Sequence, residues 1–278
     1  MVQTSNLNRI ATVPIRIDVD HENQMAAKLR RLSQSAREAT TMEPTMANPT
    51  AEDLKTLTQW DTPTICNALE IVVPERRGHG FTTEPLVPLD PDLPPVCGYA
   101  RTTTIRAAEP PNETAEEAAA KRIGYYEYVA QEPHPTIAII QDIDPRPGIG
   151  AFWGEVQTNI HKGLGVVGAV TNGSFRDIAD SARGFNLIGG MIGPSHAYVH
   201  VVNFDCQVTV GGLTVSTNDI VHADRHGAVM IPADAVTRIP AAVDLIARCE
   251  AKIIEAAKAA DFDIEKLRAA MGAARDIH

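Results

Sequence analysis

Hydrophobic and polar positions follow regular patterns from Thr50 onward, and these patterns predict both helices and strands. Thr50 can cap a helix that runs through residues 54–60, and Asp61 precedes a second short helix. Runs rich in β-branched residues predict short strands further along the chain. The expected strands cover residues 98–107, 136–143, 166–173, 199–204, 207–216, 219–224 and 227–232. This order of elements predicts an α/β fold with mixed sheets.

Three further segments have helical patterns. Residues 110–131 are rich in Glu and Ala and follow a Pro-Pro turn. Residues 154–165 end at glycine and lead directly into the strand that begins at Val166, which predicts a strand-helix-strand crossover. The last helix is expected from Asp234 to Ala259, and Pro240 should kink or restart it.

The first fifty residues differ from the rest because they are polar and irregular, with one amphipathic candidate helix from Met25 to Arg37. This segment is an arm and not a domain. It is either a partly ordered tail or a strap that crosses onto a neighbouring subunit.

Composition narrows the class of protein. The chain has 278 residues, 44% of them hydrophobic, which is enough for one large core. Its net charge of -10 argues against an extended nucleic-acid interface, although one arginine could still hold a small anion. No stretch has the length of a membrane span or the apolar core of a signal peptide, so we expect a cytoplasmic protein. The four cysteines lack metal-ligand spacing and are interpreted as buried thiols: Cys66, Cys97, Cys206 and Cys249.

The best candidate for chemistry is the stretch from Glu155 to Asp177. Glu155 opens a helix just after Gly154, and Arg176 and Asp177 follow a strand and an Asn-Gly turn. In a crossover, the start of the helix and the end of the next parallel strand lie at the same sheet edge. The two carboxylates suit Mg²⁺ or Mn²⁺, and Arg176 suits the carboxylate of a 2-oxo acid. By spacing alone, an Arg-Asp dipeptide after a turn is more often a surface ion pair or a helix cap than part of a functional site.

The same stretch resembles a known family. An acidic residue, twenty residues and then Arg-Asp is the pattern of the family that includes class II 4-hydroxy-4-methyl-2-oxoglutarate aldolases and the RraA regulators of ribonuclease E. Here Glu155 precedes residues 156–175, and Arg176 and Asp177 follow. Further blocks agree in order: DTPTICNALE, CGYARTTTI and GGLTVSTNDIVHADRHGAVMIP.

The resemblance implies an RraA-like α/β/α swivelling fold, like that of phosphohistidine domains, assembled as trimers or hexamers. The similarity runs from about Leu54 to Ala235, so together with the sequence patterns we expect an arm at residues 1–50, a catalytic domain at 51–235 and a C-terminal helical segment at 236–278. Asp177 would hold the metal directly and Glu155 through water, while Arg176 and the backbone N–H groups from Gly154 to Val156 would bind a pyruvate-like end.

Two functions follow from this resemblance. The first is a metal-dependent lyase that forms a pyruvate enolate, by retro-aldol cleavage of a 4-hydroxy-2-oxo acid or by decarboxylation of oxaloacetate. The alternative is a regulator without catalysis that binds a ribonuclease. Residues 192–205 contain no Lys or Arg, so a distal substrate carboxylate has no evident partner there.

Several other polar residues are weaker candidates. His196 and His200 could line the pocket or transfer protons, although a histidine on a strand is more often structural. A structural role is also favoured over a metal cluster for His222, Asp224 and His226. Asn218 replaces a glycine of the family turn and is expected to tolerate left-handed backbone angles. A solvated helix face is expected for Glu116, Glu117, Lys121 and Arg122.

Overall fold

Two capped helices begin the part of the chain that the computed structural model describes, residues 48–277. Helix α2 (Ala51–Leu57) starts at Thr50, which forms a capping box with Asp53. Helix α3 (Thr62–Val72) starts at Asp61, whose carboxylate accepts a hydrogen bond from the Thr64 N–H at 3.0 Å. Both predicted helix starts are confirmed, and a 3₁₀ turn at Pro74–Arg76 follows. The candidate helix from Met25 to Arg37 lies outside the described residues.

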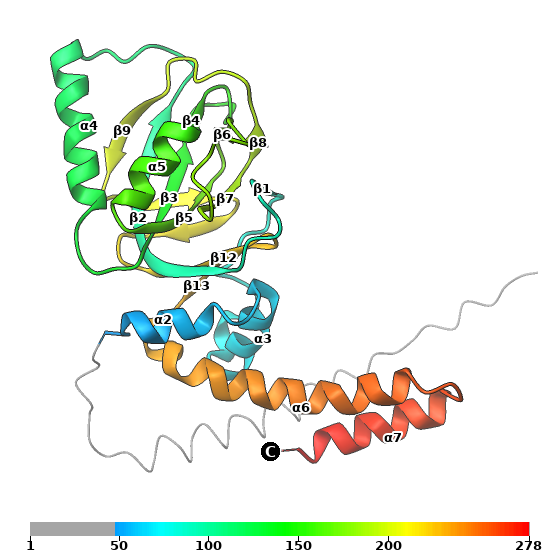
Figure 1. The fold of residues 1–278 in the computed structure, drawn as a ribbon. Coiled ribbons are helices and arrows are strands. Elements are labelled where there is room, and N and C mark those ends of the chain that lie inside the picture. Colours follow the sequence, from blue (N-terminus) through cyan, green and yellow to red (C-terminus); the bar gives the residue numbers. More distant parts are fainter. Residues whose placement is uncertain (1–47, 278) are drawn as a thin grey trace, which may run out of the picture. The chain divides into compact units, whose positions relative to one another are not determined.

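An eight-stranded mixed sheet forms the centre of the fold (Figure 1). Four neighbouring strands in its middle are parallel, namely β2, β3, β5 and β7, and antiparallel strands flank them. Along one edge of β2, its first half pairs with β12 and its second half pairs with β9. The strands are β1 (Val87–Pro88), β2 (Val96–Arg106), β3 (Thr136–Asp142), β5 (Val166–Thr171), β7 (Asn186–Gly189), β9 (His200–Phe204), β12 (Ile220–Asp224) and β13 (Gly227–Ile231).

Two smaller sheets complete the strand pairing. Strands β10 (Val208–Val210) and β11 (Leu213–Val215) form an antiparallel hairpin. Three very short strands form a parallel sheet in the order β4 (Ala151–Trp153), β6 (Ser174–Phe175) and β8 (Met191–Ile192). The sequence patterns did not predict the sheet of β4, β6 and β8, because strands of two or three residues have no periodicity to detect.

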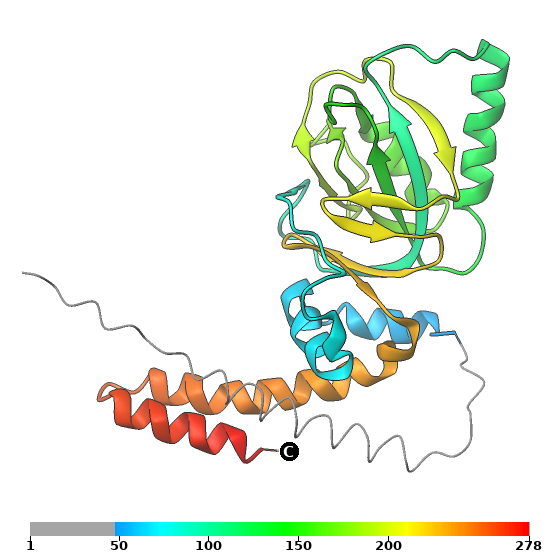
Figure 2. The same cartoon turned by 180° about the vertical axis from the view of Figure 1, so that it is seen from behind.

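Helix α5 (Glu155–Gly163) lies between β3 and β5 along the chain, and those two strands are parallel neighbours. The predicted strand-helix-strand crossover is therefore confirmed. Helix α4 (Ala115–Val129) lies beside β9 in both views (Figures 1 and 2). A cluster of buried aromatic side chains joins these helices to the sheet: Tyr125, Tyr128, Phe152, Trp153, Phe175 and Phe185.

The end of the described chain is helical. A 3₁₀ segment (Ala233–Arg238) leads into α6 (Ile239–Ala257), with Pro240 in its first turn, so the helix restarts there. A further helix, α7 (Ile264–Arg275), lies within the segment 236–278 that was expected to be helical, although it was not predicted as a separate element. The start of α6 shares a buried cluster with α2, α3 and β13, and the α6 residues in that cluster are Ile239, Ala242 and Val243.

The observed architecture is α/β with a mixed sheet, as the sequence predicts, and the sheet is curled. The prediction for the cysteines was only partly right, because Cys97 is buried whereas Cys66, Cys206 and Cys249 are intermediate in exposure. All four are free thiols. Within residues 48–277, no helix is both long and apolar enough to cross a membrane.

Candidate functional site

The structure brings Glu155, Arg176 and Asp177 together at the start of α5. Gly154 is the N-cap of this helix and has no side chain to cap it. The Asp177 carboxylate takes that place, because its Oδ2 accepts a hydrogen bond from the Glu155 N–H at 3.2 Å. A carboxylate at this position is favoured by the free N–H groups and the positive end of the helix dipole.

Gly154 makes this close approach possible. A Cβ atom added at residue 154 would lie 2.4 Å from Oδ2 of Asp177, which is far closer than non-bonded atoms allow. The sequence predicts that Gly154 contributes its backbone N–H to substrate binding. The structure gives it a second role, as the residue whose missing side chain makes room for the Asp177 carboxylate.

Arg176 is positioned by the pairing of β4 with β6. Its backbone N–H donates to the carbonyl of Trp153 at 3.0 Å, directly after the two strands pair. Its Nε lies 3.5 Å from Oδ2 of Asp177, and the two side chains are 37% and 36% exposed. Within residues 48–277, the two terminal guanidinium nitrogens have no hydrogen-bond partner, so they are available to a ligand.

The backbone at Asp177 is left-handed, with φ +54°. Aspartate tolerates this conformation better than most residues, but it remains uncommon outside glycine. The Asp177 carbonyl accepts hydrogen bonds from the N–H groups of Asp180 and Ser181, at 3.1 and 2.9 Å. This turn directs the Asp177 side chain back toward α5, and backbone strain of this kind often accompanies functional sites.

Thr158, which sequence reasoning missed, ties the site together. Its buried hydroxyl donates to the Gly154 carbonyl at 2.9 Å and accepts from the Ala182 N–H at 2.9 Å. The first turn of α5 is therefore joined to the loop that follows Asp177. A threonine four residues after a helix start was the available signal, because its hydroxyl can reach the carbonyl of residue i−4.

A buried histidine supports α5 from behind. The Nδ1–H of His161 donates to the Gln157 carbonyl at 2.7 Å, so Nε2 accepts from the Tyr125 hydroxyl at 2.6 Å. Burial lowers the pKa of His161 to about 4, and the ring is therefore neutral near pH 7. Trp153 packs on the same ring, with centroids 4.6 Å apart.

The donors at this site are two carboxylates, and no described cluster of three or more His, Cys, Asp or Glu side chains could hold a metal ion. A metal cluster is therefore also absent at His222, Asp224 and His226. Asp224 accepts hydrogen bonds from backbone N–H groups of Thr62 and His226, and burial lowers the pKa of His222 to about 4. These contacts join β12 to α3, in agreement with the structural role preferred from sequence.

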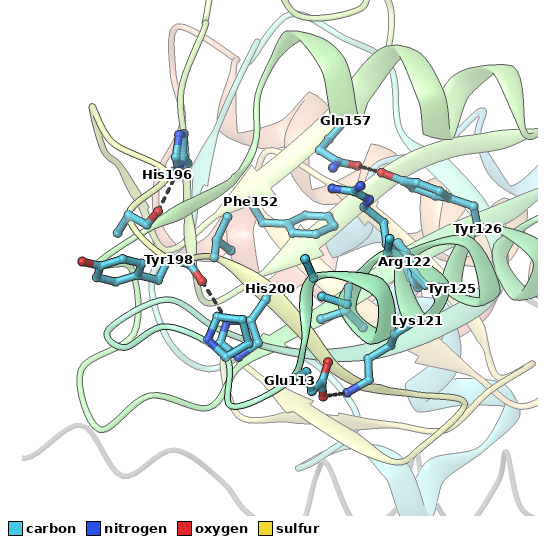
Figure 3. Close-up of a pocket in the computed structure, with 17 residues that line it drawn as sticks. Glu113, Lys121, Arg122, Tyr125, Tyr126, Phe152, Gln157, His196, Tyr198 and His200 are labelled. Atoms are coloured by element: carbon cyan, nitrogen blue, oxygen red, sulfur yellow. Dashed lines mark hydrogen bonds and ion pairs between the residues drawn. The ribbon is translucent and has the colours of Figure 1, made fainter.

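Neither His196 nor His200 forms a hydrogen bond with Asp177. They line a cavity of about 490 Å³ under α4 instead, and none of Glu155, Arg176 and Asp177 lines that cavity (Figure 3). Elsewhere, Asn218 has φ +67°, so the expected left-handed turn is confirmed.

Comparison with known proteins assigns the chain to a family. The family model for RraA-like proteins, described as Aldolase/RraA, matches residues 62–230. The chain belongs to the RraA-like family. The matched region includes α3, the central sheet, α5 and the whole candidate site.

Individual RraA-like relatives are distant. A crystal structure of an uncharacterized protein from Pseudomonas syringae has 19% identity and a TM-score of 0.59, covering 80% of this chain and all of that one. RraAS2 from Streptomyces coelicolor, described as an unusual member of the RNase ES inhibitor RraA family, has 23% identity and a TM-score of 0.54, covering 70% and 93%. These likenesses show the fold alone.

One curated protein matches a shorter segment. Protein DlpA of Legionella pneumophila is 28% identical over 91 residues, which is 31% of this chain. The match spans only 15% of the length of DlpA. The RraA-like family includes both aldolases and ribonuclease inhibitors, so membership alone does not choose between an enzyme and a regulator.

Proposed function

We propose that this RraA-like protein is a divalent-metal-dependent lyase that acts on a 2-oxo acid through a pyruvate enolate. The observation that carries the proposal is the contact of Asp177 with the start of α5, beside an arginine whose terminal nitrogens have no described partner. A cation-binding carboxylate and an anion-binding guanidinium thus lie within one side-chain length of each other. A 2-oxo acid presents the matching pair of groups, a carboxylate beside a polarisable carbonyl.

The donor set fits Mg²⁺ or Mn²⁺. These ions are commonly held by one or two carboxylates, with water and substrate oxygens filling the other positions. Oδ1 of Asp177 and the exposed carboxylate of Glu155 provide such oxygens, the second through a water molecule. The metal would act as a Lewis acid at the 2-oxo oxygen and lower the energy of the developing negative charge.

The protein's own groups would bind and orient the substrate. The Arg176 fork suits the substrate carboxylate. Because the Glu155 N–H is already bonded to Asp177, the remaining first-turn donors are the N–H groups of Val156 and Gln157. Glu155 is exposed at the helix start, where it can hold a water molecule and move a proton to or from the substrate.

Retro-aldol cleavage and decarboxylation both require the 2-oxo group to accept the electron pair of the broken bond. In the first, the C3–C4 bond breaks as the 4-hydroxyl loses its proton; in the second, the bond to the departing CO₂ breaks. Either way the electron pair moves toward the 2-oxo group, and protonation of C3 then gives pyruvate. The same arrangement of residues therefore serves both reactions.

A second copy of the chain is expected to complete the site. Four exposed apolar side chains lie near the three residues named here, either next to them in sequence or on β8, which pairs with the strand before Arg176. These are Val156, Ile178, Met191 and Ile192. Their exposure suits a surface that another subunit covers, as in a homotrimer or hexamer.

The decisive experiment measures pyruvate release from 4-hydroxy-4-methyl-2-oxoglutarate and from oxaloacetate, with Mg²⁺ or Mn²⁺ and again after EDTA. Turnover that EDTA removes and added metal restores supports the lyase. Absence of metal-dependent turnover on a panel of 2-oxo acids would reject it and leave the ribonuclease-binding regulator as the better reading.

A further inference from the structure

Helix α4 packs against the body of the protein along only half its length. Its buried residues are Tyr125, Tyr128 and Val129, all in the second half, whereas no residue from Ala115 to Arg122 is buried. Protein interiors are normally filled to high density, so a helix that stands away from its support leaves a space. Here the space is the cavity of about 490 Å³ between α4 and residues 196–201 (Figure 3). Its volume is within the range of small-molecule sites.

The walls of this cavity are apolar and include several flat surfaces. Ala118 and Ala119 form a low wall on α4, with no side chain long enough to fill the gap. Phe152 from β4 forms the opposite surface, and Val199 and Val201 contribute branched side chains. A flat apolar body would gain contact with both the alanine wall and the aromatic ring.

One end of the cavity is suited to an anion. Arg122 lines it and, among the described residues, has no hydrogen-bond or ion-pair partner. The neighbouring cation, Lys121, is already paired with Glu113. The Tyr126 hydroxyl, one turn from Arg122, donates to Oε1 of Gln157 at 3.0 Å, which leaves the Gln157 amide NH₂ as a second donor. Figure 3 shows Arg122, Tyr126 and Gln157 in the same part of the cavity.

Two histidines in the lining offer acceptor nitrogens. The Nδ1–H of His200 donates to the Tyr198 carbonyl at 2.7 Å, so its Nε2 carries a lone pair when the ring is neutral. His196 is fixed in the same way by the Ala197 carbonyl at 2.7 Å. A hydroxyl or N–H on a ligand could donate to either ring. The solvated helix face expected from sequence is confirmed, because Glu116, Glu117 and Arg122 are exposed and Lys121 is intermediate in exposure. Lys121 and Arg122 also line the cavity.

We propose that this cavity binds a small organic acid with a flat apolar body, whose carboxylate is held by Arg122 and Gln157. The site is separate from the proposed catalytic site, because neither Glu155 nor Asp177 lines it. The ligand contacts Gln157 in the first turn of α5, so the two sites share that turn. The inference does not depend on the lyase reaction.

Benzoate is the probe, and benzamide is its uncharged isostere. Isothermal titration calorimetry on the full chain, without metal, should show saturable benzoate binding with a Kd on the order of 1 mM, as expected for so small a ligand. Benzamide should bind at least about tenfold more weakly, because it cannot pair with Arg122. No saturable heat from benzoate at concentrations up to about 20 mM would overturn the proposal.

Matched variants locate the binding. Arg122→Gln should weaken benzoate binding about tenfold or more, while Arg146→Gln, at an exposed residue that does not line the cavity, should leave it unchanged. Ala118→Leu should fill the space and remove binding, whereas Ala120→Leu, on the same helix but outside the cavity, should not. Leucine and alanine are both strong helix formers, and circular dichroism melting checks that each variant is folded. Undiminished benzoate binding by Ala118→Leu would place the ligand elsewhere and refute the site.

Discussion

The geometry around Asp177 depends on the absence of a side chain at Gly154. In Gly154→Ala the new Cβ would lie 2.4 Å from Oδ2, so the carboxylate must move away from the helix start. We expect Mn²⁺ affinity to fall about tenfold or more and metal-dependent turnover to fall with it. Titration calorimetry with Mn²⁺ measures the first effect without relying on activity.

Gly163→Ala is the matched control for that experiment. Gly163 also belongs to α5, but a Cβ there meets nothing within 4 Å. The substitution should leave Mn²⁺ affinity unchanged and, through higher helix propensity, raise the free energy of unfolding by up to about 1 kcal/mol. Equal Mn²⁺ binding by both variants would show that Asp177 is not a metal ligand.

Arg176 should affect turnover much more than folding. Its side chain is 37% exposed and its only described ion pair is with Asp177, so Arg176→Ala should change the melting temperature little. The substrate carboxylate would lose its fork, and kcat/KM should fall about 100-fold or more. Arg176→Lys should recover only a small part, because an ammonium cannot form two parallel hydrogen bonds. Near wild-type kcat/KM in Arg176→Ala would contradict the assigned role.

Residue types and spacing marked Glu155, Arg176 and Asp177 only as weak candidates, because a surface ion pair or a helix cap would give the same pattern, and the resemblance to a family strengthened them. Residue types and spacing were not enough to show how these residues meet. The contact depends on the left-handed turn at Asp177 and on the hydroxyl of Thr158, and both are set by tertiary structure. The resemblance to a family supplied the pattern, but the geometry had to come from the fold.

At the scale of elements, predictions succeeded where a helix or strand is long enough to show its period. Strands β2, β3 and β5 and helices α3 and α5 lie close to their expected ranges. The sheet of β4, β6 and β8 was missed, although it is the sheet that brings Arg176 to Trp153. Helix α7 lies within the segment 236–278 that was expected to be helical, but the break between α6 and α7 was not predicted.

Two elements are held in place by buried neutral histidines, and this makes stability depend on pH. Burial lowers the pKa values of His161 on α5 and His222 on β12 from 6.5 to about 4. Between these values the unfolded chain binds protons that the folded chain does not. Stability is therefore full above about pH 6.5 and declines toward pH 4, by up to about 1.4 kcal/mol per pH unit for each histidine.

Urea unfolding at pH 7.5, 6 and 5 measures this decline. His161→Gln removes one of the two titrating rings. The slope of unfolding free energy against pH should therefore decrease by up to about 1.4 kcal/mol per pH unit, the effect of one bound proton. His79→Gln, at an exposed position, should keep the wild-type slope. An unchanged slope in His161→Gln would show that His161 is not the neutral buried ring described here.

At the scale of the whole molecule, the C-terminal helices contribute unequally to the core. Helix α6 places Ile239, Ala242 and Val243 in the cluster shared with α2 and α3, whereas α7 buries only Ala270. A chain ending at Lys258 should therefore unfold within about 1 kcal/mol of the full chain. A chain ending at Arg238 should lose about 3 kcal/mol or more, because it exposes a buried isoleucine, valine and their partners.

Chemical denaturation of the two truncated chains tests these values and also the proposed division at residues 235 and 236. If the division marks a true domain boundary, the shorter chain keeps its stability. A large loss of stability would instead show that the first half of α6 belongs to the same folded unit as the catalytic domain. The shared buried cluster favours this outcome.

Assembly gives the last prediction. Ile192 is 52% exposed on β8, whose partner strand β6 leads directly to Arg176. If a second copy covers this surface, Ile192→Glu should place a charge in the interface, and light scattering after size exclusion should detect a smaller species than the wild type. Turnover should fall too, although residue 192 is not one of the proposed substrate-binding residues. Ile264→Glu, an equally drastic change at a 64% exposed position on α7, should preserve both assembly and turnover. A wild-type monomer with full turnover would mean that one chain is a complete lyase, and the apolar side chains around its site would need another explanation.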